Sequence, residues 1–88
     1  MTRRALYLRE TTAAVRKVRT AGETMLLEQL GLANGMVTAG LFLGVITAEE
    51  DGRLYQLTQN AYQRRRAELR ADLHPYGQTY QAATQEDA

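Results

Sequence analysis

Few residues of this 88-residue chain could carry out catalysis. The sequence contains no cysteine and no serine, and its single histidine is His74. A Ser or Cys nucleophile with a histidine base therefore cannot be assembled. Three neighbouring acids, Glu49, Glu50 and Asp51, adjoin Gly52 in what is expected to be a solvated turn, which does not separate carboxyl pKa values as acid–base catalysis requires. We expect neither an enzyme nor a bound cofactor.

The length and composition predict one small globular unit. Hydrophobic residues make up 44% of the chain, which is enough for a single modest core. We expect one domain over 1–74 and a polar tail over 75–88. His74 precedes Pro75, a context typical of the end of a helix, so we expect no metal site.

Basic side chains could contact an anionic partner, because they gather in two groups although the net charge is only +1. The first group comprises Arg3, Arg4, Arg9, Arg16, Lys17 and Arg19, and the second comprises Arg64, Arg65, Arg66 and Arg70. Clustered positive charge attracts the phosphates of DNA, although solvated helix faces have the same appearance. The first group also interrupts what would be the apolar part of a signal peptide, so we expect a cytoplasmic protein.

Two short helices are expected in the apolar middle of the chain. Thr20 and Glu23 have the spacing of a capping box, which predicts a helix over 21–30 that ends before a glycine. Asn34 is a competent N-cap and predicts a second helix over 34–43. An earlier helix should begin at about Thr11 or before, although 5–8 could instead form a short strand.

A hairpin is expected next. Residues 45–48 and 53–57 have strand-like composition, and Asp51-Gly52 between them is a strong turn signal. A last helix is then predicted over 59–73. The expected core comprises Leu26, Leu30, Leu32, Val37, Leu41, Ile46 and Leu57.

A membrane span is an alternative for this middle region. The nineteen residues from Leu30 to Ala48 carry no charge, which is about the length needed to cross a bilayer. Their threonines, glycines and asparagine lower the hydropathy to near the detection threshold. We therefore expect no membrane association, and keep a single span over 30–48 as the second alternative.

In this order, the predicted elements resemble the winged helix-turn-helix superfamily of MarR-like, PadR-like and ArsR-like bacterial regulators. The resemblance covers roughly Thr11 to Leu73. It is carried by the helix-turn-helix spacing of Leu27, Gly31 and Val37 and by the wing-like segment 51–58. It implies a mainly α domain with a small β-hairpin, a winged helix-turn-helix, whose second helix enters the major groove of double-stranded DNA.

Two functions compete on this expected fold. In the first, the chain is a small DNA-binding transcriptional regulator. Its base-contacting residues would be Asn34, Met36 and Thr38, and its phosphate-contacting residues would be Arg16, Lys17, Arg19 and Arg53. That helix lacks the arginine that commonly reads guanine.

In the second, the chain binds another protein as an adaptor or inhibitor. The interface residues would then be Met36, Ala39, Gly40 and Phe42. A homodimer through the helix over 58–73 is a further possibility.

Overall fold

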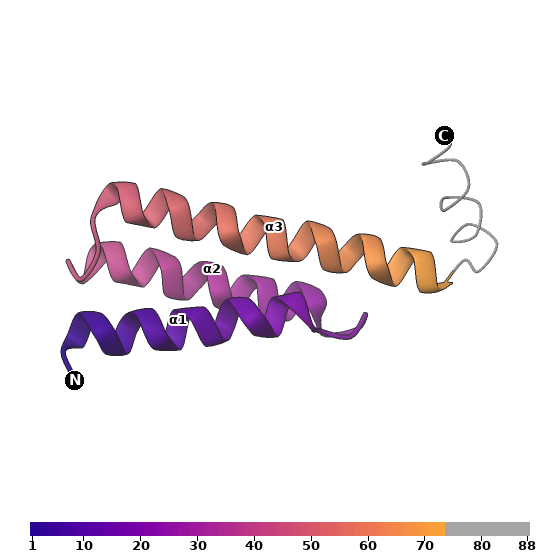
Figure 1. Cartoon of the computed structure of the whole chain (residues 1–88), viewed down its shortest axis with the longest axis horizontal. Coiled ribbons are helices and arrows are strands. Elements are labelled where there is room, and N and C mark those ends of the chain that lie inside the picture. Colours follow the sequence, from indigo (N-terminus) through magenta and orange to yellow (C-terminus); the bar gives the residue numbers. More distant parts are fainter. Residues whose placement is uncertain (74–88) are drawn as a thin grey trace.

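The computed structural model describes residues 1–73, and these form a bundle of three helices (Figure 1). The helices are α1 (Arg3–Arg19), α2 (Leu26–Phe42) and α3 (Ala48–Leu73). Figure 1 shows α1 and α3 running in the same direction and α2 running back beside them. Each helix packs against both of the others, so the core lies along the common axis.

The helices pack because the buried residues of each helix are three, four or seven positions apart and therefore share one side. On α1, Thr11 and Val18 are buried, and on α2 the buried residues are Leu26, Ala33, Val37 and Gly40. On α3 the corresponding residues are Thr58 and Ala61. This repeat places one seam of each helix toward its neighbours, as in a coiled coil.

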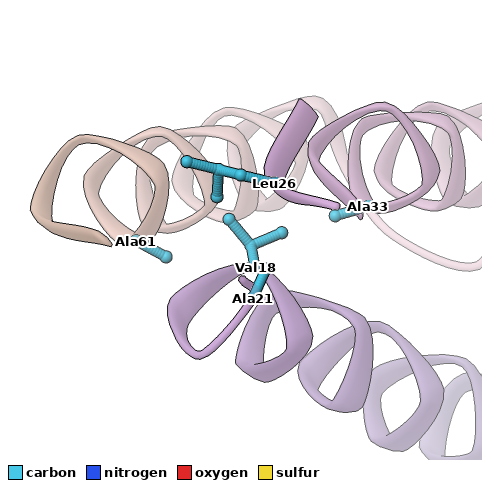
Figure 2. Close-up of a cluster of buried hydrophobic side chains, with 5 residues drawn as sticks. All are labelled: Val18, Ala21, Leu26, Ala33 and Ala61. Carbon is cyan, nitrogen blue, oxygen red and sulfur yellow. The ribbon is translucent and has the colours of Figure 1, made fainter. Parts of the chain in front are cut away.

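Small side chains dominate this core. Figure 2 shows its main cluster, which consists of Val18, Ala21, Leu26, Ala33 and Ala61. Only one of these five is larger than valine. Small residues at a helix seam let the backbones approach closely, so the bundle is thin and has little apolar volume at its centre.

Thr47 starts α3 with a capping box. The Glu50 amide donates to Thr47 Oγ1 at 3.1 Å, and the Thr47 amide donates to Glu50 Oε1 at 2.9 Å. Two otherwise unpaired amide groups are therefore satisfied at the helix start. Glu49 and Asp51 in the same turn add negative charge where the helix dipole favours it.

The predicted winged helix-turn-helix is wrong. Residues 1–73 contain no strand. The segments expected to form the hairpin lie in the α2–α3 connection and in α3. Residues 48–57 are the first turns of α3, and Asp51-Gly52 lies inside that helix. A glycine in a helix costs about 1 kcal/mol, which packing of the 26-residue α3 against two helices readily exceeds.

The predicted break in the middle of the chain is also wrong. Thr20 ends α1, and its hydroxyl donates to the Arg16 carbonyl instead of capping a following helix. Residues 21–25 belong to the α1–α2 connection, the rest of the two predicted helices over 21–30 and 34–43 merges into one continuous α2 (Leu26–Phe42), and Asn34 lies in its interior. Helices of this length gain most of their stability from tertiary packing, which here outweighs the local preference of glycine and asparagine for turns.

This continuous helix changes the predicted core. Leu26, Val37 and Ile46 are buried as expected, and Leu30 is partly buried. Three leucines expected inside are exposed: Leu32, Leu41 and Leu57. A continuous helix fixes the direction of every side chain at about 100° per residue, so Leu32 points away from the face that buries Ala33 and Leu26.

The structure also bears on the expected membrane span, the first and last predicted helices and the tail. No helix within residues 1–73 is both long and apolar enough to be a candidate membrane span. The first helix begins at Arg3, so the alternative strand over 5–8 does not form, and the helix predicted over 59–73 is the later part of α3. His74 and the predicted tail over 75–88 lie outside the described residues.

Candidate functional site

The outward side of α2 is unusually apolar for an exposed helix face. Leu27 is 70% exposed, Leu32 is 56% exposed and Phe42 is 85% exposed. The exposed residues between them on the same side are Glu28, Gly31, Gly35, Thr38 and Ala39, and we call these eight residues the outer α2 face. Glu28 is the one charged residue of α2. Apart from Glu28, this helix is therefore largely apolar both toward the core and toward solvent.

The outer α2 face has small residues at its centre and large side chains at its C-terminal end. A Cβ atom added at Gly31 or Gly35 would meet nothing within 4 Å, so the surface over these residues is open. Residues four apart lie above one another on a helix, which aligns Gly31, Gly35 and Ala39 in one shallow strip. Phe42 stands at the C-terminal end of the strip, and Leu43, which is 62% exposed, follows it.

Tyr7 covers the opposite side of the same helix. Its hydroxyl donates to the Met36 carbonyl at 3.0 Å and to the Val37 carbonyl at 3.1 Å. A Cβ atom added at Gly40 would overlap the Tyr7 ring. Gly40, which was expected in a protein interface, is therefore buried against α1, whereas Ala39 and Phe42 of the same prediction are exposed.

The three residues expected to read DNA bases do not form one exposed surface. Asn34 and Met36 are two positions apart, so they point to nearly opposite sides of α2. Asn34 is half-buried, and its Oδ1 atom is buried without a hydrogen-bond partner in the described part of the chain. Met36 is also half-buried, and only Thr38 is exposed.

The four residues expected to contact phosphates have different surroundings. Arg19 is held by Glu68 at 2.6 Å, and Arg53 by Glu49 at 2.9 Å. Arg16 and Lys17 are exposed on α1 and form no ion pair within residues 1–73. Arg9 lies two turns before Arg16, so these side chains share the outward side of α1.

Two arginines donate hydrogen bonds to the connections between helices, a role that the sequence analysis did not predict. Arg4 binds Glu50 at 2.6 Å and donates from Nη1 to the Val45 carbonyl at 3.2 Å, which ties α1 to the α2–α3 connection. Arg65 donates from Nε to the Ala21 carbonyl at 2.7 Å in the α1–α2 connection. The spacing of Thr47 and Glu50 is a capping-box signal that could have located the start of α3, where Glu50 binds Arg4.

Hydrogen bonds from arginines lower the pKa values of two carboxyl groups. Hydrogen bonds from Arg4, together with the Thr47 amide, lower the pKa of Glu50 from 4.5 to about 2. Hydrogen bonds from Arg19 and Arg65 lower the pKa of Glu68 from 4.5 to about 2. Both carboxylates are accessible to water, so we interpret them as structural ties and not as catalytic groups.

A pH titration of unfolding should reveal the Glu68 tie. Its lowered pKa means that its contribution is complete above about pH 4.5 and is lost as the pH falls through about 2. We expect the stability difference between the native chain and Glu68→Gln, measured by urea unfolding, to shrink from pH 6 to pH 2.5. Glu10→Gln, which removes an exposed carboxylate of α1, is the matched control. A difference between native and Glu68→Gln that does not change with pH would contradict this role.

The described residues also form two open pockets between helices. One of about 220 Å³ is lined by Leu8, Leu54 and Leu57, with Glu50 and Arg53 beside them. A second of about 190 Å³ is lined by Leu26, Leu69, Glu23, Arg66 and Arg70. Within residues 1–73 no group of three or more His, Cys, Asp or Glu side chains could hold a metal ion.

Comparison with protein-family models, with curated proteins and with solved structures finds no match to this chain. The candidate site therefore depends on the geometry of the outer α2 face. From the sequence, Leu32 was expected in the core and Leu27 was named only for the helix-turn-helix spacing, so neither was expected on an exposed face. The available signal was the presence of only one charged residue among the seventeen of α2, which leaves no polar side to face water.

Proposed function

We propose that this chain is a protein-binding module and that the outer α2 face is its contact surface. The observation that supports this most directly is the unequal distribution of apolar volume. The core is built largely from alanine, valine and threonine, whereas Leu27, Leu32 and Phe42 are exposed. Monomeric proteins rarely expose a large contiguous apolar patch, and such a patch commonly marks a site of protein association.

The chemistry of the surface also favours a protein partner. The centres of protein interfaces are depleted of charge and enriched in aromatic side chains, and a few buried anchors supply most of the binding energy. Glu28 near one end is the only charge on the outer α2 face, and Phe42 at the other end is the natural anchor. Phosphate-bearing ligands would find no cation on this surface.

Binding of DNA is a second candidate, supported by a different helix. Arg9, Arg16 and Lys17 are exposed along α1 and could contact phosphates without reading sequence. This candidate keeps the expected nucleic-acid partner but assigns it to α1, and it does not involve a winged helix.

One photo-crosslinking experiment in the natural host separates the two candidates. A photoreactive phenylalanine analogue would replace Phe42, Arg16 or, as a control on the exposed side of α3, Gln63. We expect position 42 to form a protease-sensitive adduct that is absent at position 63. A nuclease-sensitive adduct at position 16, with none at position 42, would overturn the protein-binding proposal in favour of DNA. The absence of any adduct at position 42 would also overturn it.

A further inference from the structure

We infer that the partner of the outer α2 face is a second copy of the same chain, with the two α2 helices antiparallel about a twofold axis at Gly35. This inference rests on the proposed function, because it identifies the occupant of that surface. A twofold interface uses one patch on both copies, so the patch must be complementary to itself. The outer α2 face meets this requirement.

The small residues at the centre of the outer α2 face are symmetric about Gly35, and antiparallel pairing sets Phe42 level with Glu28 of the other copy. Gly31 and Ala39 lie four residues to either side of it, so antiparallel pairing places each against the other copy's counterpart. Phe42 stands seven residues from Gly35, and a long side chain on a helix leans toward the helix N-terminus. Its ring is thereby carried over Gly31 of the partner, where the structure leaves the surface open.

Charge favours the antiparallel direction. Glu28 is the only charged residue of α2, and parallel pairing would set the two copies of Glu28 against each other. Antiparallel pairing separates them by fourteen residues of helix, or about 21 Å. At that distance, repulsion between exposed charges is largely screened at physiological salt.

The area available predicts a moderate dimer. Phe42, at 85% exposure, offers on the order of 150–200 Å² by itself. Leu27, Leu32 and Leu43 extend the apolar surface along the seventeen residues of α2, a length of about 25 Å. Stable interfaces bury about 800 Å² on each partner, so this strip forms the centre of a small interface. We expect a dissociation constant on the order of 10 µM.

Charge substitutions at the axis provide the main test. Gly35→Lys and Gly35→Glu should each leave the fold intact by circular dichroism, because Gly35 is exposed and its Cβ position is open. Each variant alone places two like charges at the axis, and we expect at least a tenfold loss of dimer in sedimentation equilibrium. An equimolar mixture of the two should restore the dimer. Gln63→Lys and Gln63→Glu on α3 are the matched controls and should dimerise like the native chain.

Single cysteines test the direction of pairing, and the absence of native cysteine gives a clean background. Gly35→Cys should form an intermolecular disulfide because residue 35 lies at the axis. Glu28→Cys should not, since a disulfide requires Cα atoms within about 7 Å of each other. Disulfides at both positions would overturn the antiparallel arrangement.

The outcomes also separate this inference from the proposed function. A purified native chain that stays monomeric up to about 1 mM overturns self-pairing, as does a Gly35 mixture that fails to recover the dimer. If position 42 still crosslinks to a different protein in the host, the protein-binding function stands and only its occupant is wrong. If position 42 crosslinks neither to a second copy of the purified chain nor to any protein in the host, both proposals fail.

Discussion

Replacing Gly40 by alanine should destabilise the chain by about 1–3 kcal/mol, although alanine is the better helix former. The added methyl group would overlap the ring of Tyr7, which lies directly on Gly40. Tyr7 must then move, and its hydrogen bonds to the Met36 and Val37 carbonyls are weakened or lost. A hydrogen bond of this kind contributes about 0.5–1.5 kcal/mol. Urea unfolding followed by circular dichroism measures the change.

Gly52→Ala is the matched control for this substitution. Gly52 lies inside α3, and a Cβ atom there would meet nothing within 4 Å. Its replacement should therefore stabilise the chain by about 0.5–1 kcal/mol. The cost of Gly40→Ala should also disappear in a Tyr7→Ala background, because the overlapping ring is gone. If Gly40→Ala proved as stabilising as Gly52→Ala, the packing of α1 against α2 described above would be incorrect.

Two adjacent leucines should respond very differently to truncation. Leu26 is 6% exposed and belongs to the central cluster, so Leu26→Ala should cost about 2–5 kcal/mol. Leu27 is 70% exposed, so Leu27→Ala should cost less than about 1 kcal/mol. A small domain has only about 5–15 kcal/mol of stability in total, so the first variant should be close to unfolding.

These leucine variants must be compared below the concentration at which the chain associates, because Leu27 belongs to the outer α2 face. Thermal unfolding at about 1 µM meets this condition. At higher concentration, Leu27→Ala should additionally weaken association, whereas a Leu26→Ala chain that remains folded should not. Equal losses for the two variants in the dilute measurement would show that the register of α2 is wrong.

Local signals in the sequence were reliable where one interpretation dominated. The helical character of 59–73 is present in α3, and a helix before Thr20 was expected and is α1. The absence of a cysteine or serine nucleophile followed directly from composition. By contrast, the segment from Thr47 to Gly52 contains a turn dipeptide, on which the hairpin prediction rested, and also a capping box, which starts α3 and which the sequence analysis did not use.

The candidate surface depended on which side of α2 faces inward. Its sequence has one charge and apolar residues on every side, so periodicity does not distinguish the buried face from the exposed one. Large leucines were expected in the core for that reason. Two of the four buried positions of α2 are instead small, Ala33 and Gly40, and at Gly40 the Tyr7 ring lies too close for a larger side chain.

The sequence by itself determined the chemistry that is available: no nucleophile with a histidine base, basic residues near the start of the chain, and an apolar middle. Tertiary structure alone decided that Gly31 and Asn34 remain helical and that Leu27, Leu32 and Phe42 face outward. The physical reason is one of scale. A glycine or asparagine lowers helix stability by about 1 kcal/mol or less, whereas packing α2 along its length against two other helices contributes several times that amount.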